Sequence, residues 1–533
     1  MIWRLSQVAV ALLAAFSLPF AGCGWRVERS PCVLALTLPA DPPTLNPVTA
    51  TDVTAGQVNR YVFESLLERD NETLELVPML AKRWEVSDDK LTYTFWLRED
   101  VLWHDGERFD ADDVIYTFER IRDPKVDAAR LRNYFRDITS IEKLGEDAVR
   151  FVYSRPYFKA LEVIGGATII PKHAFEDGRD FNAHPLGRNP IGTGPYRFVG
   201  WKTGRSIDLE KNESYWGREP AIEGISYKII PDRTVAFQLL KKGALDMEAL
   251  RTIQWARQTE SESFASQFEK YRYYLPNYSY IGWNIRRPMF SDRRVRIAMT
   301  MLINREAILE KILFGEGQIV ASNFYRFGKN YDSSIAPYPF DPRRARELLD
   351  EAGWVDTDGD GIRDKDGVPF RFKLLSPAGS GFSKSLGLFL REELSKVGIS
   401  MGLQQFEWAT MLDMLSRRDF DAASLAWSTT LEEDPYQVWH SSQAVEGSNF
   451  VGFSNERADA LIEDARREFD SNRRAELYRE FQRILHREEP YTFLFTAPSL
   501  VAVARRFENV KAYRLGVDIL EWGIGPWPVL MEW

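Results

Sequence analysis

The chain has 533 residues, more than one hydrophobic core usually covers, so we expect at least two lobes. Hydrophobic residues make up 44% and charged residues 28% of the chain, which is typical of a globular protein. The net charge of −9 and the lack of any Lys/Arg-rich run argue against a nucleic-acid partner, because phosphates require a clustered basic surface. Two cysteines are too few for a disulfide scaffold or a cysteine metal site.

Residues 1–22 have the pattern of a cleaved signal peptide. The apolar stretch 8–20 follows a basic start and is too short to span a bilayer comfortably. The run Phe20-Ala21-Gly22-Cys23 resembles a lipobox, although its first position has Phe instead of the usual Leu. We therefore expect Cys23 to be lipidated and residues 23–32 to link the anchor to the folded protein. The alternative is a plain signal peptide with a disulfide between Cys23 and Cys32.

The first part of the chain predicts mainly strands. Residues 33–38 predict a buried strand whose following loop, 41–47, lies where α/β sheets bind ligands. Residues 92–97 alternate in a β pattern and end in the turn Trp103-His104-Asp105-Gly106. Asp110 then has the position of an N-cap for a following helix. Further elements are predicted for a strand at 148–153, a strand at 226–231 and a helix at 233–242.

The second part alternates helices and strands, which predicts an α/β fold. Strands are expected near 278–284, 370–375, 401–406, 422–427 and 491–495. Helices are expected from Ser291 as a cap, from Asn304, from Asp341-Pro342 to Gly353, and at 383–397, 409–415, 456–469 and 473–487.

The sequence offers little support for catalysis. Its five histidines are far apart and none has metal-ligand spacing. No G-x-S-x-G motif occurs. Lys202-Thr203-Gly204 lacks the serine elements of a penicillin-binding site and predicts a turn between strands. The glycines at 192 and 194 precede Pro195 without a Lys-Ser/Thr pair, so they predict a turn and not a phosphate loop.

An acidic run at 356–367 is the one metal candidate. Asp356, Asp358 and Asp360 alternate before Gly361, as in the first half of a calcium loop. Gly367 stands where the bidentate Glu of such a loop belongs. A weak structural calcium site and a metal-free acidic hairpin both stay open, and no other cofactor is expected.

The block at 81–106, AKRWEVSDDKLTYTFWLREDVLWHDG, resembles the signature of the family 5 bacterial extracellular solute-binding proteins, the peptide-binding subunits of ABC importers. The resemblance extends from 33 to about 517, in the order of blocks as well as in their residues. Especially specific are Tyr280-Ile281-Gly282-Trp283-Asn284, Asp434-Pro435, Trp439-His440-Ser441-Ser442, Asn449-Phe450-Val451-Gly452 and Glu489-Pro490-Tyr491.

The resemblance implies an α/β fold with the two lobes of a type II periplasmic binding protein and an extra subdomain inserted in the first lobe. The expected boundaries are 33–277 for lobe one, about 60–190 for the inserted subdomain, 278–510 for lobe two and 511–533 for a return to lobe one.

The resemblance also implies where a peptide would bind. Its main chain would pair with an extended edge of each lobe, at Thr51, Asp52 and Val53 in lobe one and at Ala426, Trp427 and Ser428 in lobe two. Trp408 would cover a ligand side chain. The alternative for Trp408 and Trp427 is an ordinary core position.

The sequence departs from the family where short peptides are held by their ends. Relatives bind the ligand's amino terminus with an Asp three residues after the equivalent of Trp427, and Thr430 stands there in this chain. Either one of Glu432, Glu433 and Asp434 replaces that Asp, or the ligand has no buried free amine. We expect these three acids to form an exposed loop face. The basic residues that meet the ligand carboxylate in some relatives correspond to Leu415 and Ser424, so longer peptides are expected.

The resemblance implies a lipid-anchored, non-enzymatic receptor in the periplasm or on the outer face of the cell membrane. Its expected partners are a peptide ligand, the permease subunits of an ABC importer and the membrane that holds the anchor, and the protein itself is expected to be a monomer. The alternatives are a nickel chelate, haem or sugar as ligand in the same fold, or a different class, an envelope hydrolase.

Overall fold

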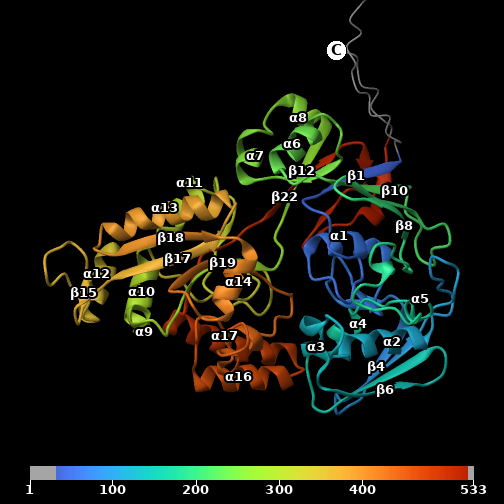
Figure 1. Cartoon of the computed structure of the whole chain (residues 1–533), viewed down its shortest axis with the longest axis horizontal. Helices are drawn as coiled ribbons and strands as arrows, with labels where there is room; N and C mark the ends of the chain where they lie inside the picture. The colour runs from blue at the N-terminus through green and yellow to red at the C-terminus, as the bar shows by residue number, and fades with distance from the viewer. Residues whose placement is uncertain (1–31, 526–533) are drawn as a thin grey trace, which may run out of the picture. The chain divides into compact units, whose positions relative to one another are not determined.

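The computed structural model describes residues 32–525 (Figure 1). The predicted signal peptide and the lipidation site Cys23 lie outside the described residues. Cys32, which would pair with Cys23 in the alternative disulfide, is the first described residue and is half-buried. Within the described range, no helix has the length and apolar composition needed to cross a bilayer.

The first sheet has the strand order β1-β10-β9-β8. β1 (Val33–Leu38) runs parallel to β10 (Gly224–Ile229), and β9 (Ser206–Lys211) and β8 (Tyr196–Lys202) follow in antiparallel pairs. The buried strand predicted at 33–38 is therefore confirmed. The turn predicted at 202–204 connects β8 to β9, where Gly204 has a φ of +70°.

A four-stranded antiparallel sheet lies between β1 and β8 in the sequence, with the order β4 (Ala81–Val86), β5 (Thr92–Leu97), β7 (Ala148–Tyr153) and β6 (Ile138–Lys143). α2 (Ala111–Arg122) packs against it, with the Phe118 ring 4.7 Å from the Phe151 ring. Asp110 caps α2 in a capping box with Asp113, which confirms the predicted cap. α3 (Ala129–Phe135) follows α2.

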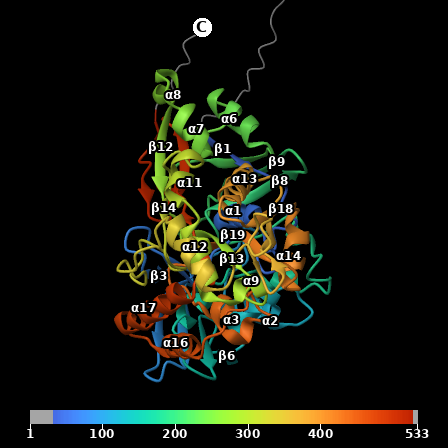
Figure 2. The ribbon, with the colours of Figure 1, turned by 90° about the vertical axis from the view of Figure 1, so that its left-hand side faces the viewer.

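A three-stranded sheet with the order β11-β22-β12 joins distant parts of the chain. β22 (Ser499–Ala504) pairs with both β11 (Met247–Ala249) and β12 (Phe268–Tyr273). Helices α6 (Arg233–Lys241), α7 (Thr252–Arg257) and α8 (Glu262–Gln267) lie beside this sheet in both ribbon views (Figure 2). β22, from the segment expected for lobe two, thus pairs with two strands from the segment expected for lobe one.

The largest sheet has five strands in the order β18-β17-β19-β13-β20. Helices cover both of its faces. Consecutive residues of β17 point to opposite faces, and Leu374 packs in one apolar cluster while Leu375 packs in another. The predicted alternation of strands and helices is confirmed. The strands are β13 (Asn277–Trp283), β17 (Arg371–Pro377), β18 (Ser400–Phe406), β19 (Ala422–Ser428) and β20 (Tyr491–Phe493). The longer helices around them are α10 (Arg293–Met301), α12 (Pro342–Glu351), α13 (Gly381–Ser395), α14 (Trp408–Ser416), α16 (Glu456–Arg467) and α17 (Ser471–Glu488).

In the described chain, three 3₁₀ turns lie at Pro185–Gly187, Ser441–Gln443 and Ile519–Glu521, and the remaining α-helices and strands are mostly short. They are α1 (Val53–Val62), β2 (Leu67–Arg69), β3 (Leu76–Pro78), α4 (Ala160–Gly165), α5 (Lys172–Phe175), α9 (Pro288–Ser291), α11 (Arg305–Lys311), β14 (Gln318–Ile319), β15 (Asp364–Lys365), β16 (Val368–Pro369), α15 (Tyr436–Trp439), β21 (Phe495–Thr496), β23 (Phe507–Glu508), β24 (Ala512–Tyr513), β25 (Gly516–Val517) and β26 (Gly523–Ile524).

Separate apolar cores follow this division into sheets. One cluster combines the first sheet and the antiparallel sheet with residues near the end of the chain, among them Phe507, Ile519 and Trp522. Two clusters lie on the faces of the five-stranded sheet, and a fourth joins α6 to β22 through Phe237 and Leu500. Several cores are expected for a chain of this length.

Two local predictions differ from the structure. Ser291 is not the cap of α10, because the side chain of the next residue, Asp292, accepts the hydrogen bond from Arg294 N. Thr51 to Val53 do not form an extended sheet edge. Asp52 is the N-cap of α1, with its Oδ1 2.8 Å from Ala55 N, and Val53 is the first helical residue. An Asp before a helical run is a favourable cap, and this local chemistry decides the conformation.

Candidate functional site

One edge of β19 is open. β19 pairs along its whole length with β13, from Asn277 opposite Ser428 to Trp283 opposite Ala422. On its other side, β17 pairs only with Ala422 and Ala423. Among the described residues, no strand therefore lies beside the edge from Ser424 to Ser428.

The hydrogen-bond pattern identifies which backbone groups face this edge. The carbonyl oxygen of Ser279 in β13 accepts a bond from Leu494 N, on the side of β13 away from β19. Because backbone groups alternate along an antiparallel pair, the residue opposite Ser279, Ala426, directs its N–H and C=O away from β13. Ser428, opposite Asn277, does the same. Two of the three residues predicted for this edge thus present unpaired backbone donors and acceptors.

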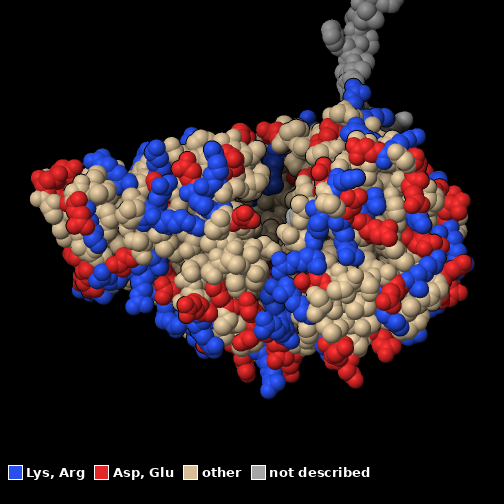
Figure 3. All heavy atoms as spheres, turned by 60° about the horizontal axis from the view of Figure 1, so that its bottom comes forward, with Lys and Arg blue, Asp and Glu red and all other residues tan. Residues whose placement is uncertain are grey.

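A cavity of about 330 Å³ adjoins this edge. Its walls come from sequence segments on both sides of β13, and Figure 3 shows the surface hollowed between the two halves of the molecule. The lining residues before β13 are Asn133, Tyr134, Arg136, Asp137, Tyr157 and Lys159. Those from β13 onward are Tyr278, Trp427, Ser428, Thr429, Thr430, Glu433, Asp434, Tyr436, Gln437, Val438, Ser448 and Arg466.

Trp427 contributes an aromatic wall. Its side chain is half-buried, and its ring lies parallel to that of Phe450 at a centroid distance of 6.3 Å. It therefore combines partial packing with exposure to the cavity, which suits contact with a ligand. Trp408, at the start of α14, is 56% exposed and does not line the cavity, so the core alternative is wrong for Trp408.

The three predicted residues near α1 do not line this cavity either. Val53 is 77% exposed and Thr51 is also exposed. Leu415 and Ser424, which correspond to basic positions in some relatives, are buried. Neither of these two side chains supplies a charge for a ligand carboxylate.

The acidic residues after Thr430 are partly buried, so the prediction of an exposed loop face is wrong. Glu432 lies 2.8 Å from Lys329 and 3.1 Å from Arg474. Burial alone would raise the pKa of Glu432, but these two cations lower it below the usual value. These partners lie far from Glu432 in the sequence, and no local pattern announced them.

Asp434 is also paired. Arg466 lies 3.0 Å from its Oδ2, and the Tyr157 hydroxyl donates to the same oxygen at 3.1 Å. Burial and the neighbouring carboxylate raise the pKa of Tyr157 well above its usual value, so the phenol stays protonated and donates.

Glu433 is the acid of the three that has no ion pair within 4 Å among the described residues. Its Oε2 accepts a hydrogen bond from Thr430 N at 3.1 Å. Burial raises the pKa of Glu433 to about 7, although the positive charge of Lys159 and the bond from Thr430 oppose the rise. This carboxyl therefore titrates near neutral pH inside the cavity.

Lys159, Tyr157 and Phe158 connect the two sides of the cavity, and sequence reasoning missed all three. Lys159 Nζ donates to Thr430 Oγ1 at 2.9 Å, and Phe158 N donates to Arg466 O at 3.0 Å. The Arg474 guanidinium lies over the Phe158 ring at 4.4 Å. Their only sequence signal is the run Tyr157-Phe158-Lys159 after Pro156, which has no specific meaning by itself.

A second cavity of about 510 Å³ continues from the first and shares Tyr134, Lys159 and Thr430 with it. Its other walls include the loop before α1, at Pro47 and Val48, together with residues of β2, α3 and α4. A ligand longer than the first cavity therefore has further space beside it.

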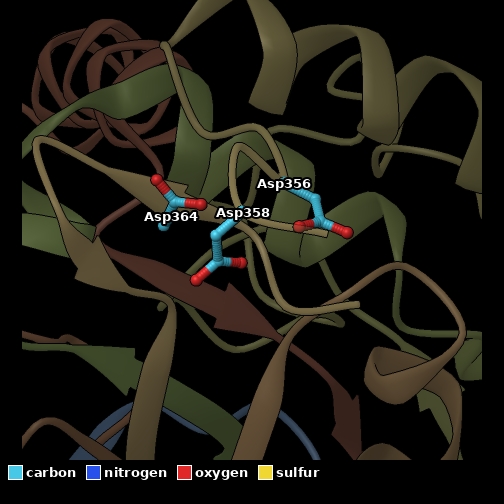
Figure 4. Close-up of side chains that lie close together, drawn as sticks. All are labelled: Asp356, Asp358 and Asp364. Carbon is cyan, nitrogen blue, oxygen red and sulfur yellow. The ribbon is translucent and has the colours of Figure 1, made fainter. Parts of the chain in front are cut away.

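The acidic loop lies in a different region, before the β15–β16 hairpin. The structure groups the carboxylates of Asp356 and Asp358 with that of Asp364, within 4.8 Å of one another, in place of the predicted Asp360 (Figure 4). Asp360 instead lies 3.4 Å from Arg371. The three grouped carboxylates already accept hydrogen bonds from loop residues, for example from Gly359 N to Asp356. Calcium loop and acidic hairpin both stay open.

Comparisons with known proteins agree with the fold described above. Residues 75–449 match the sequence profile of the bacterial extracellular solute-binding proteins, family 5 Middle. The oligopeptide-binding protein AppA of Bacillus subtilis is 30% identical over 489 residues, which cover 88% of this chain and 87% of that protein.

Solved structures give the same result. AppA from Bacillus subtilis in complex with a nonapeptide has a TM-score of 0.81 and 28% identity, covering 93% of this chain and 99% of that one. NikZ from Campylobacter jejuni in complex with Ni(L-His) has a TM-score of 0.79 and 26% identity, with 92% and 99% covered. The predicted α/β fold of a two-lobed type II periplasmic binding protein is therefore confirmed.

Proposed function

Because the chain belongs to the bacterial extracellular solute-binding proteins of family 5, we propose that it binds oligopeptides beside the open edge of β19 and delivers them to the permease of an ABC importer. The observation that carries this proposal is the unpaired backbone of Ala426 and Ser428 next to a cavity. An extended peptide satisfies such groups with its own main chain, and this pairing does not depend on its side chains.

The cavity supports longer peptides as ligands. Of the three acids near Thr430, Glu432 is paired with Lys329 and Arg474 and Asp434 with Arg466, so among the described residues only Glu433 of the three is left for a terminal ammonium. The adjoining second cavity gives room for the chain to continue. The relative AppA was solved with a nonapeptide, which fits a site of this extent.

Delivery to a permease requires that the peptide-bound and peptide-free forms of the protein differ in conformation. A peptide between the lobes contacts both and thereby favours the closed arrangement, which a permease can distinguish from the open one. The contacts of Tyr157, Phe158 and Lys159 with residues after β19 are the described interactions that such closure would strengthen. Thr51, Asp52, Val53 and Trp408 stay predicted contacts of the ligand.

We further propose that the protein acts outside the cytoplasm as a monomer held to a membrane through a lipid on Cys23. The signal-peptide and lipobox patterns support this location. The family consists of solute-binding proteins and not of enzymes, and we propose that the ligand is likewise released unchanged.

The test is a thermal-shift screen of residues 23–533 with a non-lipidated first residue. Peptide pools should raise the melting temperature, because a ligand that binds only the folded state stabilises it. Mass spectrometry of material that co-purifies with the protein should then identify peptides. If peptides leave the melting temperature unchanged while nickel–histidine, haem or a sugar raises it, the peptide assignment is wrong. Peptide cleavage that is lost in a single-residue variant would favour a hydrolase.

A further inference from the structure

Lys159 lies where the open edge of β19 leads into the cavity. The residue is only 5% exposed, and its Nζ donates to Thr430 Oγ1 at 2.9 Å. It lines both cavities. A buried ammonium at a ligand-facing position is expensive, so its place there calls for a functional reason.

The positive charge of Lys159 is weakly compensated by the protein. The one carboxylate within 4 Å of its Nζ among the described residues is that of Glu162, at 3.8 Å. Glu162 itself is engaged more closely by Arg69, at 2.8 Å. Thr430 offers a neutral oxygen only, and that hydroxyl already donates to the carbonyl of Glu432. The ammonium therefore retains capacity for another electron-rich partner.

A bound peptide would reach this ammonium. Ala426 and Ser428 direct their backbone to the open edge of β19, and Ser428 and Thr430 line the cavity that adjoins this edge. A main chain that pairs with Ala426 and Ser428 extends past Thr430 toward Lys159. Whatever group the peptide has at that point meets a cation that is already in place.

The neighbouring acids offer little attraction for a second ammonium group. Asp434 is paired with Arg466 and Glu432 with Lys329, so both carboxylate charges are balanced by cations of the protein itself. Glu433 accepts the Thr430 N–H, and the positive charge of Lys159 already acts on its carboxyl by lowering its pKa. A second ammonium would have to compete with Lys159 for this one carboxyl.

We infer that Lys159 determines specificity at this end of the site, rejecting a free amino terminus beside Thr430 and accepting an oxygen, either a carbonyl of a longer peptide or an acyl cap. The inference rests on the proposed peptide binding and narrows the class of peptide. Repulsion between two ammonium groups in a partly dehydrated cavity is strong, whereas an N–H···O=C bond from a lysine is favourable.

The test compares two nonapeptide pools of the same random composition, both amidated at the carboxyl end. One pool has free amino termini and the other is N-acetylated. Binding of each pool is measured by titration against the wild type and the variants Lys159→Met and Lys159→Gln. The matched control is Lys384→Met, a substitution of an exposed lysine. Lys159→Gln keeps a hydrogen-bond donor for Thr430 and removes only the charge.

We expect the wild type and the Lys384 variant to bind the acetylated pool about tenfold more tightly than the free pool. Both Lys159 variants should lose this preference, because the ammonium is gone. A wild type that prefers free amino termini, or a preference that survives in Lys159→Gln, would overturn the inference while leaving peptide binding intact. If neither pool binds the wild type, the proposed function itself fails and the inference with it.

Discussion

Replacing Ala426 with proline tests the central feature of the site, the open backbone of β19. Proline has no N–H, and its ring occupies the direction in which that N–H points. The N–H of Ala426 faces away from β13, so the substitution removes no ladder bond of the folded protein. Proline is tolerated at strand edges for this reason. The variant should therefore fold and keep a melting temperature close to that of the wild type.

The expected loss of affinity follows from one hydrogen bond. In this variant, a peptide carbonyl that approaches residue 426 finds no donor and stays unsatisfied at the strand edge. Such a group costs about 1–3 kcal/mol, which corresponds to a rise in Kd of roughly 5- to 150-fold. Isothermal titration with a peptide identified by mass spectrometry measures this change directly.

Two control variants separate the loss of the outward N–H from the effects of added bulk and of a lost bond within the sheet. Ala426→Val adds bulk but keeps the N–H, so its Kd should change by less than about threefold. Leu425→Pro removes an N–H that faces β13 and should lower the melting temperature clearly. A folded Ala426→Pro variant with wild-type affinity would refute pairing of the ligand with this edge.

Three further perturbations test other parts of the structure. Tyr157→Phe removes the donor to Asp434 and should weaken the closed arrangement by about 1 kcal/mol, lowering peptide affinity severalfold in the same titration; unchanged affinity would mean that this contact does not contribute to closure. Glu489 is 3% exposed and burial raises its pKa from 4.5 to about 8, so its contribution to stability is present below about pH 4.5 and is lost as the pH rises through 8. Between pH 5 and 8, the free energy of unfolding should consequently fall less in Glu489→Gln, by about 1 kcal/mol or more, than in the wild type or in the exposed control Glu476→Gln. Melting temperatures measured across this pH range report the difference, and parallel pH profiles would contradict it. Millimolar calcium should leave the melting temperature unchanged if the acidic loop is a metal-free hairpin, whereas a rise that disappears in Asp358→Asn would identify a calcium loop.

Local chemistry made much of the fold predictable. The segment from Asp341 to Gly353 contains a cap, a proline at the first helical position and a glycine after the helix, and α12 forms between them with Gly353 at a φ of +85°. Asp110 likewise caps α2 as expected. Ser291 was the wrong cap because the adjacent Asp292 competes for the same role, and sequence spacing alone does not separate two neighbouring polar residues.

The site was predicted less completely, because its interactions join distant segments. Ala426, Trp427 and Ser428 were found through the resemblance to the family, and the open edge that gives them meaning is visible only in the pairing of β19. The partners of Glu432 and Asp434, among them Arg474 and Arg466, are separated from them by helices. No periodicity or motif encodes such ion pairs. The helical start at Val53 was missed because residue order from relatives outweighed the cap signal of Asp52.

An open strand edge is ordinarily a liability, since it can pair with another copy of the chain. In this molecule the open part of β19 is short, from Ser424 to Ser428, and it adjoins a cavity of about 330 Å³. On the opposite wall, Tyr157 donates a hydrogen bond to Asp434 and Lys159 donates one to Thr430. Because these contacts hold a second wall beside the edge, we expect them to hinder its pairing with another copy of the chain. Breaking these contacts, as in Tyr157→Phe or Lys159→Met, should therefore increase self-association as well as change the affinity for peptides. Light scattering of the ligand-free variants measures the self-association.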